Sequence, residues 1–237
     1  MIRVAVSAAV ALVVAAALAV GTGASTRPNP ASFEPRIDNP WFPLHPGTVY
    51  VYRGRKDAKR ARDVVTVLSR TATIDGVRCR AVDDRLYLNG KLGERTTDWY
   101  AQDRAGNVWY FGEETAELDR RGHVTSTEGT WRTGKHGARA GIVMPAHPRV
   151  GRGFRQEFYK GHAEDHFVTL SLSAPVRTPA ASSRHALLTK EWTPLEPGTI
   201  DHKLYVRGVG MVEEKTVRGG DERSVLVSVR GAPRSGA

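Results

Sequence analysis

The side chains best suited to chemistry lie in one short segment, Gly-His-Ala-Glu-Asp-His at residues 161–166. Alternate residues of a strand share a face, so His162, Glu164 and His166 would project together. Two imidazoles and a carboxylate can bind zinc and leave a fourth position for water. The alternative is a polar hairpin tip, which Gly161 and the acidic pair favour. Because no fourth ligand is indicated, we predict no metal site and no cofactor.

A second group of candidates is aromatic: Trp99, Tyr100, Trp109, Tyr110 and Phe111. These residues lie on two segments that we expect to pair as neighbouring strands. Side chains alternate across a strand, so some of these rings must face opposite sides of the sheet. One side could stack on a sugar ring or line an apolar pocket. The alternative is ordinary core and cross-strand packing.

A third group consists of charged residues in strand-like surroundings: Glu113, Glu157, Lys190, Glu191, His202 and Lys203. Charges near a core are usually paired, so salt bridges between neighbouring strands are one interpretation. The functional interpretation is a polar cluster at the mouth of the sheet, where a carboxylate of raised pKa acts as a general base. The candidate ligand-binding residues are therefore Trp99, Tyr100, Trp109, Tyr110, Glu113, Glu164, Asp165, Lys190, Glu191 and His202.

The scaffold that must position these residues is predicted to consist of strands and tight turns. Asn89-Gly90 stands between two apolar segments and predicts a two-residue hairpin, since both residues accept positive φ angles. Further hairpins are expected from 96–102 with 108–112, from 154–159 with 167–172, and from 211–217 with 223–229. Helical periodicity is nearly absent, and 113–121 could form two turns at most. The fold class predicted is all-β, with an antiparallel, strongly curved sheet that is half-barrel or barrel-like.

The beginning of the chain has the order of a secretory signal peptide: one basic residue, an apolar run from 4 to 20, and then small residues. We assign 1–24 to the signal, 25–40 to a flexible linker, 41–231 to a single β-rich domain and 232–237 to a disordered tail. A retained anchor is the alternative, although a spanning helix needs about 20 apolar residues. In both cases we expect the domain to be secreted or otherwise extracytoplasmic.

Composition restricts the partners. A single cysteine, Cys79, excludes an intramolecular disulfide, so stability must come from burial and hydrogen bonding. The net charge of +10 would favour acidic wall polymers, but the excess of arginine over lysine is what a GC-rich coding bias would give, and we prefer that explanation. No RNA-binding or helix-turn-helix signature is present, so no nucleic-acid partner is expected. We expect a monomer that contacts the membrane only through the signal segment.

Several motifs together resemble an uncharacterised family of bacterial exported proteins. They are Asp-Asn-Pro-Trp-Phe-Pro-Leu at 38–44 with Pro-Gly-Thr at 46–48, and the segments 98–103, 106–113, 144–146, 163–165 and 189–195. The resemblance covers nearly all of the chain after the signal and implies no known activity, so no catalytic roles carry over. The first motif is also similar, in layout alone, to half-barrel domains related to the LolA and LolB lipoprotein carriers. That similarity implies a curved antiparallel sheet that holds an apolar ligand.

Three functions follow, in order of preference. The first is a non-catalytic binding domain of the cell envelope for an apolar or amphipathic ligand or a partner protein. The second is a structural surface protein that binds acidic wall polymers. The third is a secreted hydrolase, in which Glu164, Asp165, Glu191 and His202 should converge in one cleft. No Gly-x-Ser-x-Gly elbow and no Gly-rich phosphate loop is present to favour a known catalytic class.

Overall fold

The computed structural model describes residues 29–231, and the predicted signal 1–24 and tail 232–237 lie outside them. Within this part of the chain the structure is almost entirely antiparallel β, with one short 3-10 helix, η1 (Pro30–Ser32), and no α-helix. No helix of the described residues is long and apolar enough to span a membrane. The predicted all-β class with a strongly curved sheet is confirmed.

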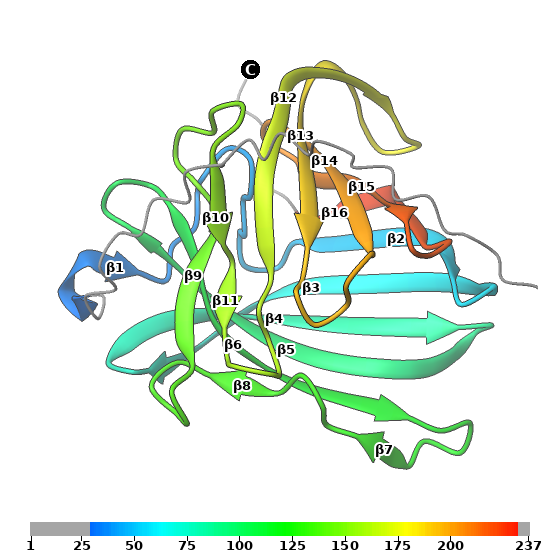
Figure 1. Ribbon diagram of the computed structural model, residues 1–237, viewed down its shortest axis with the longest axis horizontal. Coiled ribbons are helices and arrows are strands. Elements are labelled where there is room, and N and C mark those ends of the chain that lie inside the picture. The colour runs from blue at the N-terminus through cyan, green and yellow to red at the C-terminus, as the bar shows by residue number, and fades with distance from the viewer. Residues whose placement is uncertain (1–28, 232–237) are drawn as a thin grey trace, which may run out of the picture.

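One sheet contains all the strands and curls on itself (Figure 1). Its order is β10-β12-β13-β14-β15-β16-β2-β3-β4-β5-β6-β9-β11, with β1, β7 and β8 attached at the side. The first seven strands in that order are β10 (Gly153–Arg155), β12 (His166–Arg177), β13 (Ser182–Trp192), β14 (Ile200–Val206), β15 (Gly210–Arg218), β16 (Arg223–Arg230) and β2 (Val49–Lys56). The others are β3 (Lys59–Ile74), β4 (Val77–Leu88), β5 (Lys91–Asp103), β6 (Val108–Leu118), β9 (Arg139–Met144), β11 (Glu157–Phe158), β1 (Phe33–Glu34), β7 (Val124–Ser126) and β8 (Trp131–Arg132).

The tight turns lie where local chemistry predicts them. Asn89 and Gly90 have φ angles of 50° and 84°, as a two-residue hairpin turn between β4 and β5 requires. The predicted pairings of 96–102 with 108–112 and of 211–217 with 223–229 are those of β5 with β6 and of β15 with β16. Residues 113–118, which could have formed a helical turn, continue β6 instead, because they pair with β5 along its length.

The predicted hairpin of 154–159 with 167–172 is only half correct. Its first part, β10, pairs with β12, from Gly153 opposite Val168 to Arg155 opposite His166. The chain then changes partner, and β11 pairs with β9 at the other end of the strand order. A single segment, 153–158, therefore bonds to both edges of the sheet and brings them together as a barrel.

A small residue allows this closure. A Cβ atom on Gly141 of β9 would lie 2.3 Å from the carbonyl oxygen of Arg155 and 2.6 Å from the carbonyl carbon of Gln156. Both are backbone atoms, so no side-chain rotation could relieve the clash. Glycine at this position lets the crossing segment approach the strand it joins.

The segment 29–40 differs from the flexible linker we predicted. Phe33 pairs with Asp103 across β1 and β5, and Ile37 is buried in the main core. The side-chain oxygen of Gln102 accepts hydrogen bonds from the backbone N–H groups of Asp38 and Asn39, at 3.0 and 2.9 Å. Proline and asparagine in this segment make specific contacts rather than a free tether, and packing against the sheet holds it.

Two apolar clusters lie on opposite faces of the sheet. The larger one fills part of the barrel interior. The smaller one lies on the outer face, where Trp99 and Phe111 pack with Cys79 and are covered by Phe33. Cys79 is fully buried there, and burial raises the pKa of its thiol to about 12. It is a packed apolar residue, as its alternation with Val77 and Ala81 predicted.

Candidate functional site

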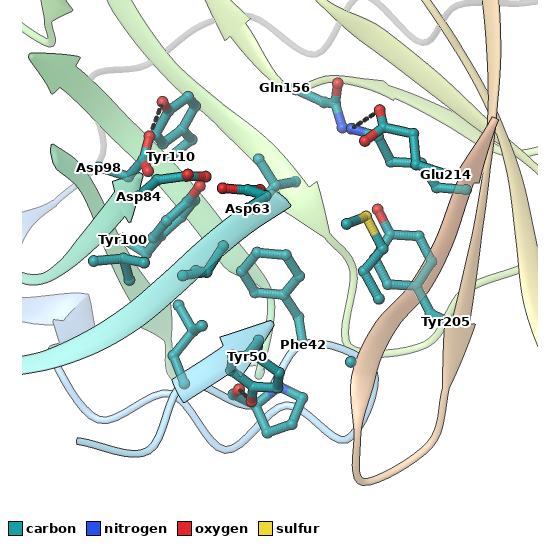
Figure 2. Close-up of a pocket in the computed structure, with 18 of the residues that line it drawn as sticks. Phe42, Tyr50, Asp63, Asp84, Asp98, Tyr100, Tyr110, Gln156, Tyr205 and Glu214 are labelled. Carbon is teal, nitrogen blue, oxygen red and sulfur yellow. Dashed lines mark hydrogen bonds and ion pairs between the residues drawn. The ribbon is translucent and has the colours of Figure 1, made fainter. Parts of the chain in front are cut away.

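The barrel interior contains a cavity of about 310 Å³. Part of its lining is apolar and aromatic, with Phe42 from the loop before β2 and other apolar groups such as Val65, Val143 and Met211. Six aromatic rings line the cavity: Phe42, Tyr50, Tyr52, Tyr100, Tyr110 and Tyr205. They come from strands far apart in the sequence, and Figure 2 shows several of them gathered around one space.

Carboxylates form the other part of the lining. Residues paired directly across neighbouring strands share a face of the sheet. Asp63 is paired with Tyr52, and Asp98 is paired with Val82 on one side and with Glu113 on the other, so these side chains share the inward face. Figure 2 shows Asp63, Asp84 and Asp98 grouped on one wall, with Glu214 and Gln156 elsewhere around the cavity. We call the following set the acidic lining; its members border the cavity or the adjoining hollow of about 350 Å³: Asp63, Asp84, Asp98, Glu113, Glu157, Asp165, Glu191 and Glu214.

Asp63 and Asp84 share a proton. Burial raises the pKa of Asp84 well above its ordinary value, and the hydrogen bond to Asp63 and the charge of Asp63 raise it further. Burial also raises the pKa of Asp63, although the bond to Asp84 opposes that rise. Two carboxyls in hydrogen-bond contact cannot both be ionised without strong repulsion, so Asp84 carries the proton. The second oxygen of Asp63, Oδ1, is buried without a hydrogen-bond partner.

Asp98 lies beside this pair and is bonded to an aromatic hydroxyl. The hydroxyl of Tyr110 donates to Asp98 Oδ1 at 2.5 Å. Burial raises the pKa of Asp98 to about 7, with the Tyr110 bond acting in the opposite direction. The ring of Tyr110 also stacks on Tyr100, with centroids 4.8 Å apart. Asp98 is therefore a buried carboxyl that titrates near neutral pH at the edge of an aromatic surface.

Glu113 and Glu157 continue the acidic lining toward the hollow. Burial, with repulsion from Asp98 next, raises the pKa of Glu113 to about 9. Burial and then repulsion from Asp165 raise the pKa of Glu157 to about 8. Glu157 is only 6 % exposed, and its Oε2 atom has no hydrogen-bond partner. Both residues are neutral acids at pH 7, and the Oε2 atom of Glu157 can still form a hydrogen bond.

Lys203 is the one lysine or arginine in the lining of the cavity and the hollow, and His162, whose Nδ1 lies 2.8 Å from Glu128 Oε1, borders the hollow as well. Its Nζ atom lies 3.0 Å from Glu191 Oε2 and 3.3 Å from Glu214 Oε1. Burial acts to lower the pKa of Lys203, but Glu191 and Glu214 outweigh it and raise that pKa well above its ordinary value. Glu191 also accepts a hydrogen bond from Thr189 Oγ1 at 2.9 Å. The charge of Lys203 is thus already balanced within the wall.

Most donor groups of the cavity are also engaged. The hydroxyls of Tyr50 and Tyr52 donate to the backbone oxygens of Pro43 and Met211, at 2.8 and 3.1 Å. Tyr205 donates to Glu191 Oε1 at 3.3 Å. What the cavity offers an occupant is therefore aromatic surface and carboxyl groups, while the hydroxyls of Tyr50, Tyr52 and Tyr205 are already engaged.

The structure separates the predicted site residues into two groups. Tyr100 lines the cavity, together with Tyr110 and Asp165, and Glu113 and Glu191 border the hollow with Asp165. Charges in β13 and β14 do form cross-strand salt bridges, as one interpretation expected, but these pairs also border the hollow.

The remaining candidates lie elsewhere. Trp99 and Trp109 belong to the outer cluster. Lys190 and His202 are opposite one another on β13 and β14, and alternation puts them on the face away from Glu191 and Lys203. Glu164 accepts a hydrogen bond from the backbone of its own turn and lines neither space.

The segment 161–166 does not gather its side chains around a common point. His162 Nδ1 lies 2.8 Å from Glu128 Oε1, while His166 Nδ1 lies 2.8 Å from the backbone oxygen of Glu164. Within residues 29–231, no group of three or more His, Cys, Asp or Glu side chains is placed to hold a metal ion. The four residues proposed for a hydrolase do not converge either, since Asp165 and Glu191 border the hollow but Glu164 and His202 do not.

Sequence reasoning missed Asp63, Asp84, Asp98 and Glu214. A signal for them does exist: Asp63 is in phase with Val65 and Val67, and Asp84 is in phase with Val82, on faces that otherwise look like core. An acidic residue in phase with a buried face of a strand is a functional candidate.

Comparison with known proteins gives only an overall likeness. No protein-family model matches the chain, and no curated protein matches it in sequence. A solved structure of a Bacteroides fragilis protein, designated as exported and as having a YmcC-like fold, is similar with a TM-score of 0.46 and 13 % identity. A protein of Parabacteroides distasonis, designated as a lipoprotein, is similar with a TM-score of 0.42 and 10 % identity. Each comparison covers 80 % of this chain and 98 % of the other, and at this level neither carries an argument about function.

Proposed function

We propose that this chain is an exported binding protein that takes a small amphipathic ligand into the barrel. The observation that carries the proposal is the unfilled interior: a cavity of about 310 Å³ lined by six aromatic rings and a set of carboxyls. Small-molecule sites are concave and mostly apolar, with a few placed polar groups, and their volumes start near 300 Å³. A barrel evolved only for stability would fill this space with side chains.

The two ends of the cavity suit an amphipathic ligand. Phe42 and Tyr50 lie together in an apolar region away from Asp63, Asp84 and Asp98 (Figure 2), where burial of an apolar arm is favoured by about 25 cal/mol per Å². The acidic lining and the hollow provide a polar region in which a head group can keep hydrogen bonds. A purely apolar ligand would leave the carboxyls of that region unsatisfied.

The proposal that the protein is exported rests on residues 1–24, whose charged, apolar and small segments follow the order of a signal peptide. Sequencing the N-terminus of the protein recovered outside the cytoplasm tests it. A new N-terminus near residue 25 is expected. An intact Met1 on membrane-bound protein would support the retained anchor instead.

The binding proposal is tested with N-phenyl-1-naphthylamine, an apolar dye that fluoresces when it leaves water, and with native mass spectrometry of the purified chain. We expect dye binding, and displacement by amphipathic compounds. Val143→Trp should abolish it, because the larger ring fills the cavity that Val143 lines. The matched control is Val217→Trp, at a residue that is 44 % exposed and outside the cavity. Equal dye binding by both variants would contradict an interior site.

A further inference from the structure

We infer that the ligand of the barrel is an organic cation, an amine or ammonium head group on an apolar arm. This inference rests on the proposed binding function and adds the chemical class of the ligand. Four features of the lining carry it: the carboxyl-rich wall, the aromatic surface beside it, a buried carboxyl oxygen without a partner, and a wall whose one lysine is already paired.

The first feature is the carboxyl-rich wall. Asp63, Asp84 and Asp98 face the cavity. The hydroxyls of Tyr50 and Tyr52 already donate hydrogen bonds to backbone oxygens. Burial and then repulsion between carboxyls already raise the pKa values of Glu113 and Glu157, and an anion would add to that repulsion. An occupant that donates hydrogen bonds and carries positive charge is complementary to this wall.

The second feature is the aromatic surface next to those carboxyls. Tyr100 and Tyr110 stack with an interplanar angle of 17°, and Phe42 meets Tyr100 edge-on with centroids 5.4 Å apart. Aromatic rings beside a carboxyl such as Asp98 are typical of sites in which proteins bind ammonium groups, because the ring quadrupole attracts a cation. Figure 2 shows these rings beside the acidic wall.

The third feature is the carboxyl of Glu157. The residue is only 6 % exposed, and its Oε2 atom lacks a hydrogen-bond partner. It borders both the cavity and the hollow. A buried oxygen without a partner is costly, and it becomes satisfied when a ligand donates to it.

The fourth feature concerns what kind of cation fits. Lys203, the lysine of the lining, is held by Glu191 and Glu214, so it is not available as a countercharge for the other carboxyls if they ionise beside a bound ligand. Among the described residues, no three acidic or imidazole side chains converge as a metal ion would require. The carboxyls are spread over the walls, so they suit a head group larger than a metal ion. The chain's net charge of +10 does not attract cations from a distance, so any preference must arise from the interior.

The test compares three probes that share an octyl arm: octylammonium, octanol and octyl sulfate, each titrated into the wild-type chain at neutral pH by calorimetry below its micelle-forming concentration. We expect the ammonium to bind at least about tenfold more tightly than octanol, and octyl sulfate to bind most weakly. Equal binding of the ammonium and octanol, or tighter binding of the sulfate, would overturn the cation inference and leave the proposed binding function intact. Absence of binding by all three would overturn both.

Single substitutions test whether the preference for the ammonium over octanol arises from carboxyls inside the barrel. Glu157→Gln and Asp98→Asn should each weaken ammonium binding by about tenfold while octanol binding stays within about twofold, since the apolar region is unchanged. Glu34→Gln, at an exposed residue outside the cavity, should change neither. If Glu34→Gln weakens ammonium binding as much as Glu157→Gln does, the attraction is a surface effect and the inference fails. Circular dichroism of each variant establishes that it is folded.

Discussion

The Nζ atom of Lys203 lies 3.0 Å from Oε2 of Glu191, and the two residues come from neighbouring strands of the barrel wall. Glu191 is 6 % exposed and has Thr189 as a second partner. Removing one partner of a buried ion pair leaves the other charge without compensation. The ion pair is therefore part of the wall that borders the hollow, and its loss would alter both stability and the charge of the site.

Replacement of Lys203 should destabilise the protein, because it removes the partner of two carboxylates, Glu191 and Glu214. Lys203→Met leaves Glu191 and Glu214 facing each other without a countercharge. Breaking a fully buried pair costs about 3–5 kcal/mol, and we expect about 2–3 kcal/mol here because the Lys203 side chain keeps 25 % of its surface exposed. Urea unfolding measures the loss. The double variant Lys203→Met/Glu191→Gln should recover part of it, and a double variant as unstable as the sum of the two single changes would show that the pair is not coupled.

The pH dependence of stability should reveal the neutral state of Glu157. Its pKa is raised from the ordinary 4.5 to about 8, so between those values the folded chain binds more protons than the unfolded chain. The stabilisation from this group is complete below pH 4.5 and is lost as the pH rises through 8. The groups around it are Asp98, Asp165, Trp131 and Lys203.

Glu157→Gln is expected to keep the neutral form at every pH. It should match the wild type in Tm near pH 5 and exceed it near pH 9 by at least roughly 2–4 °C, the shift for about 1 kcal/mol in a domain of this size. Differential scanning calorimetry at a series of pH values measures the difference. Glu34→Gln should follow the wild type throughout. Parallel curves for the wild type and Glu157→Gln would mean that Glu157 is already ionised at pH 7.

Closure of the barrel should depend on Gly141. The added methyl group of Gly141→Ala would meet the backbone of Arg155 and Gln156 at 2.3–2.7 Å, so the crossing segment must move. We expect a loss of about 1–3 kcal/mol or more, the usual cost of overpacking. In Gly220→Ala, the nearest neighbour is a side-chain methyl of Thr216 at 3.1 Å, which can shift. Urea midpoints that fall equally in both variants would argue against a special role for the closure point.

The segment that covers the outer cluster should contribute to stability. Phe33 meets Trp109 and Phe111 edge-on, with centroids 5.7 and 5.3 Å apart. Phe33→Ala should cost about 1–3 kcal/mol, below the 3–5 kcal/mol of a fully buried phenylalanine because Phe33 is half-buried. Val150→Ala, at a residue 62 % exposed, is the control and should be nearly neutral. If Phe33→Ala leaves the free energy of unfolding unchanged, the segment acts as a linker and does not stabilise the domain.

Local chemistry in the sequence was enough to predict the strands and several turns. Asn89 and Gly90 form a tight turn wherever two strands meet them, because their positive φ angles are a property of those residue types. The opposite faces of Trp99 and Tyr100 follow from the alternation of a strand. These features need only neighbours along the chain, so the class of fold could be predicted from one sequence.

The candidate site could not be predicted in the same way, because its members meet only across the barrel. Asp63 and Glu157 come from strands that are distant in the sequence, and the segment 153–158 brings the second one inside by changing its pairing partner. Strand periodicity assigns a residue to one of two faces but does not say which face becomes the interior. By itself the sequence determined a curved sheet of alternating strands and the residue types on each face. Only the tertiary structure decided that the acidic face closes around a cavity, because that depends on contacts between the two distant edges of the sheet.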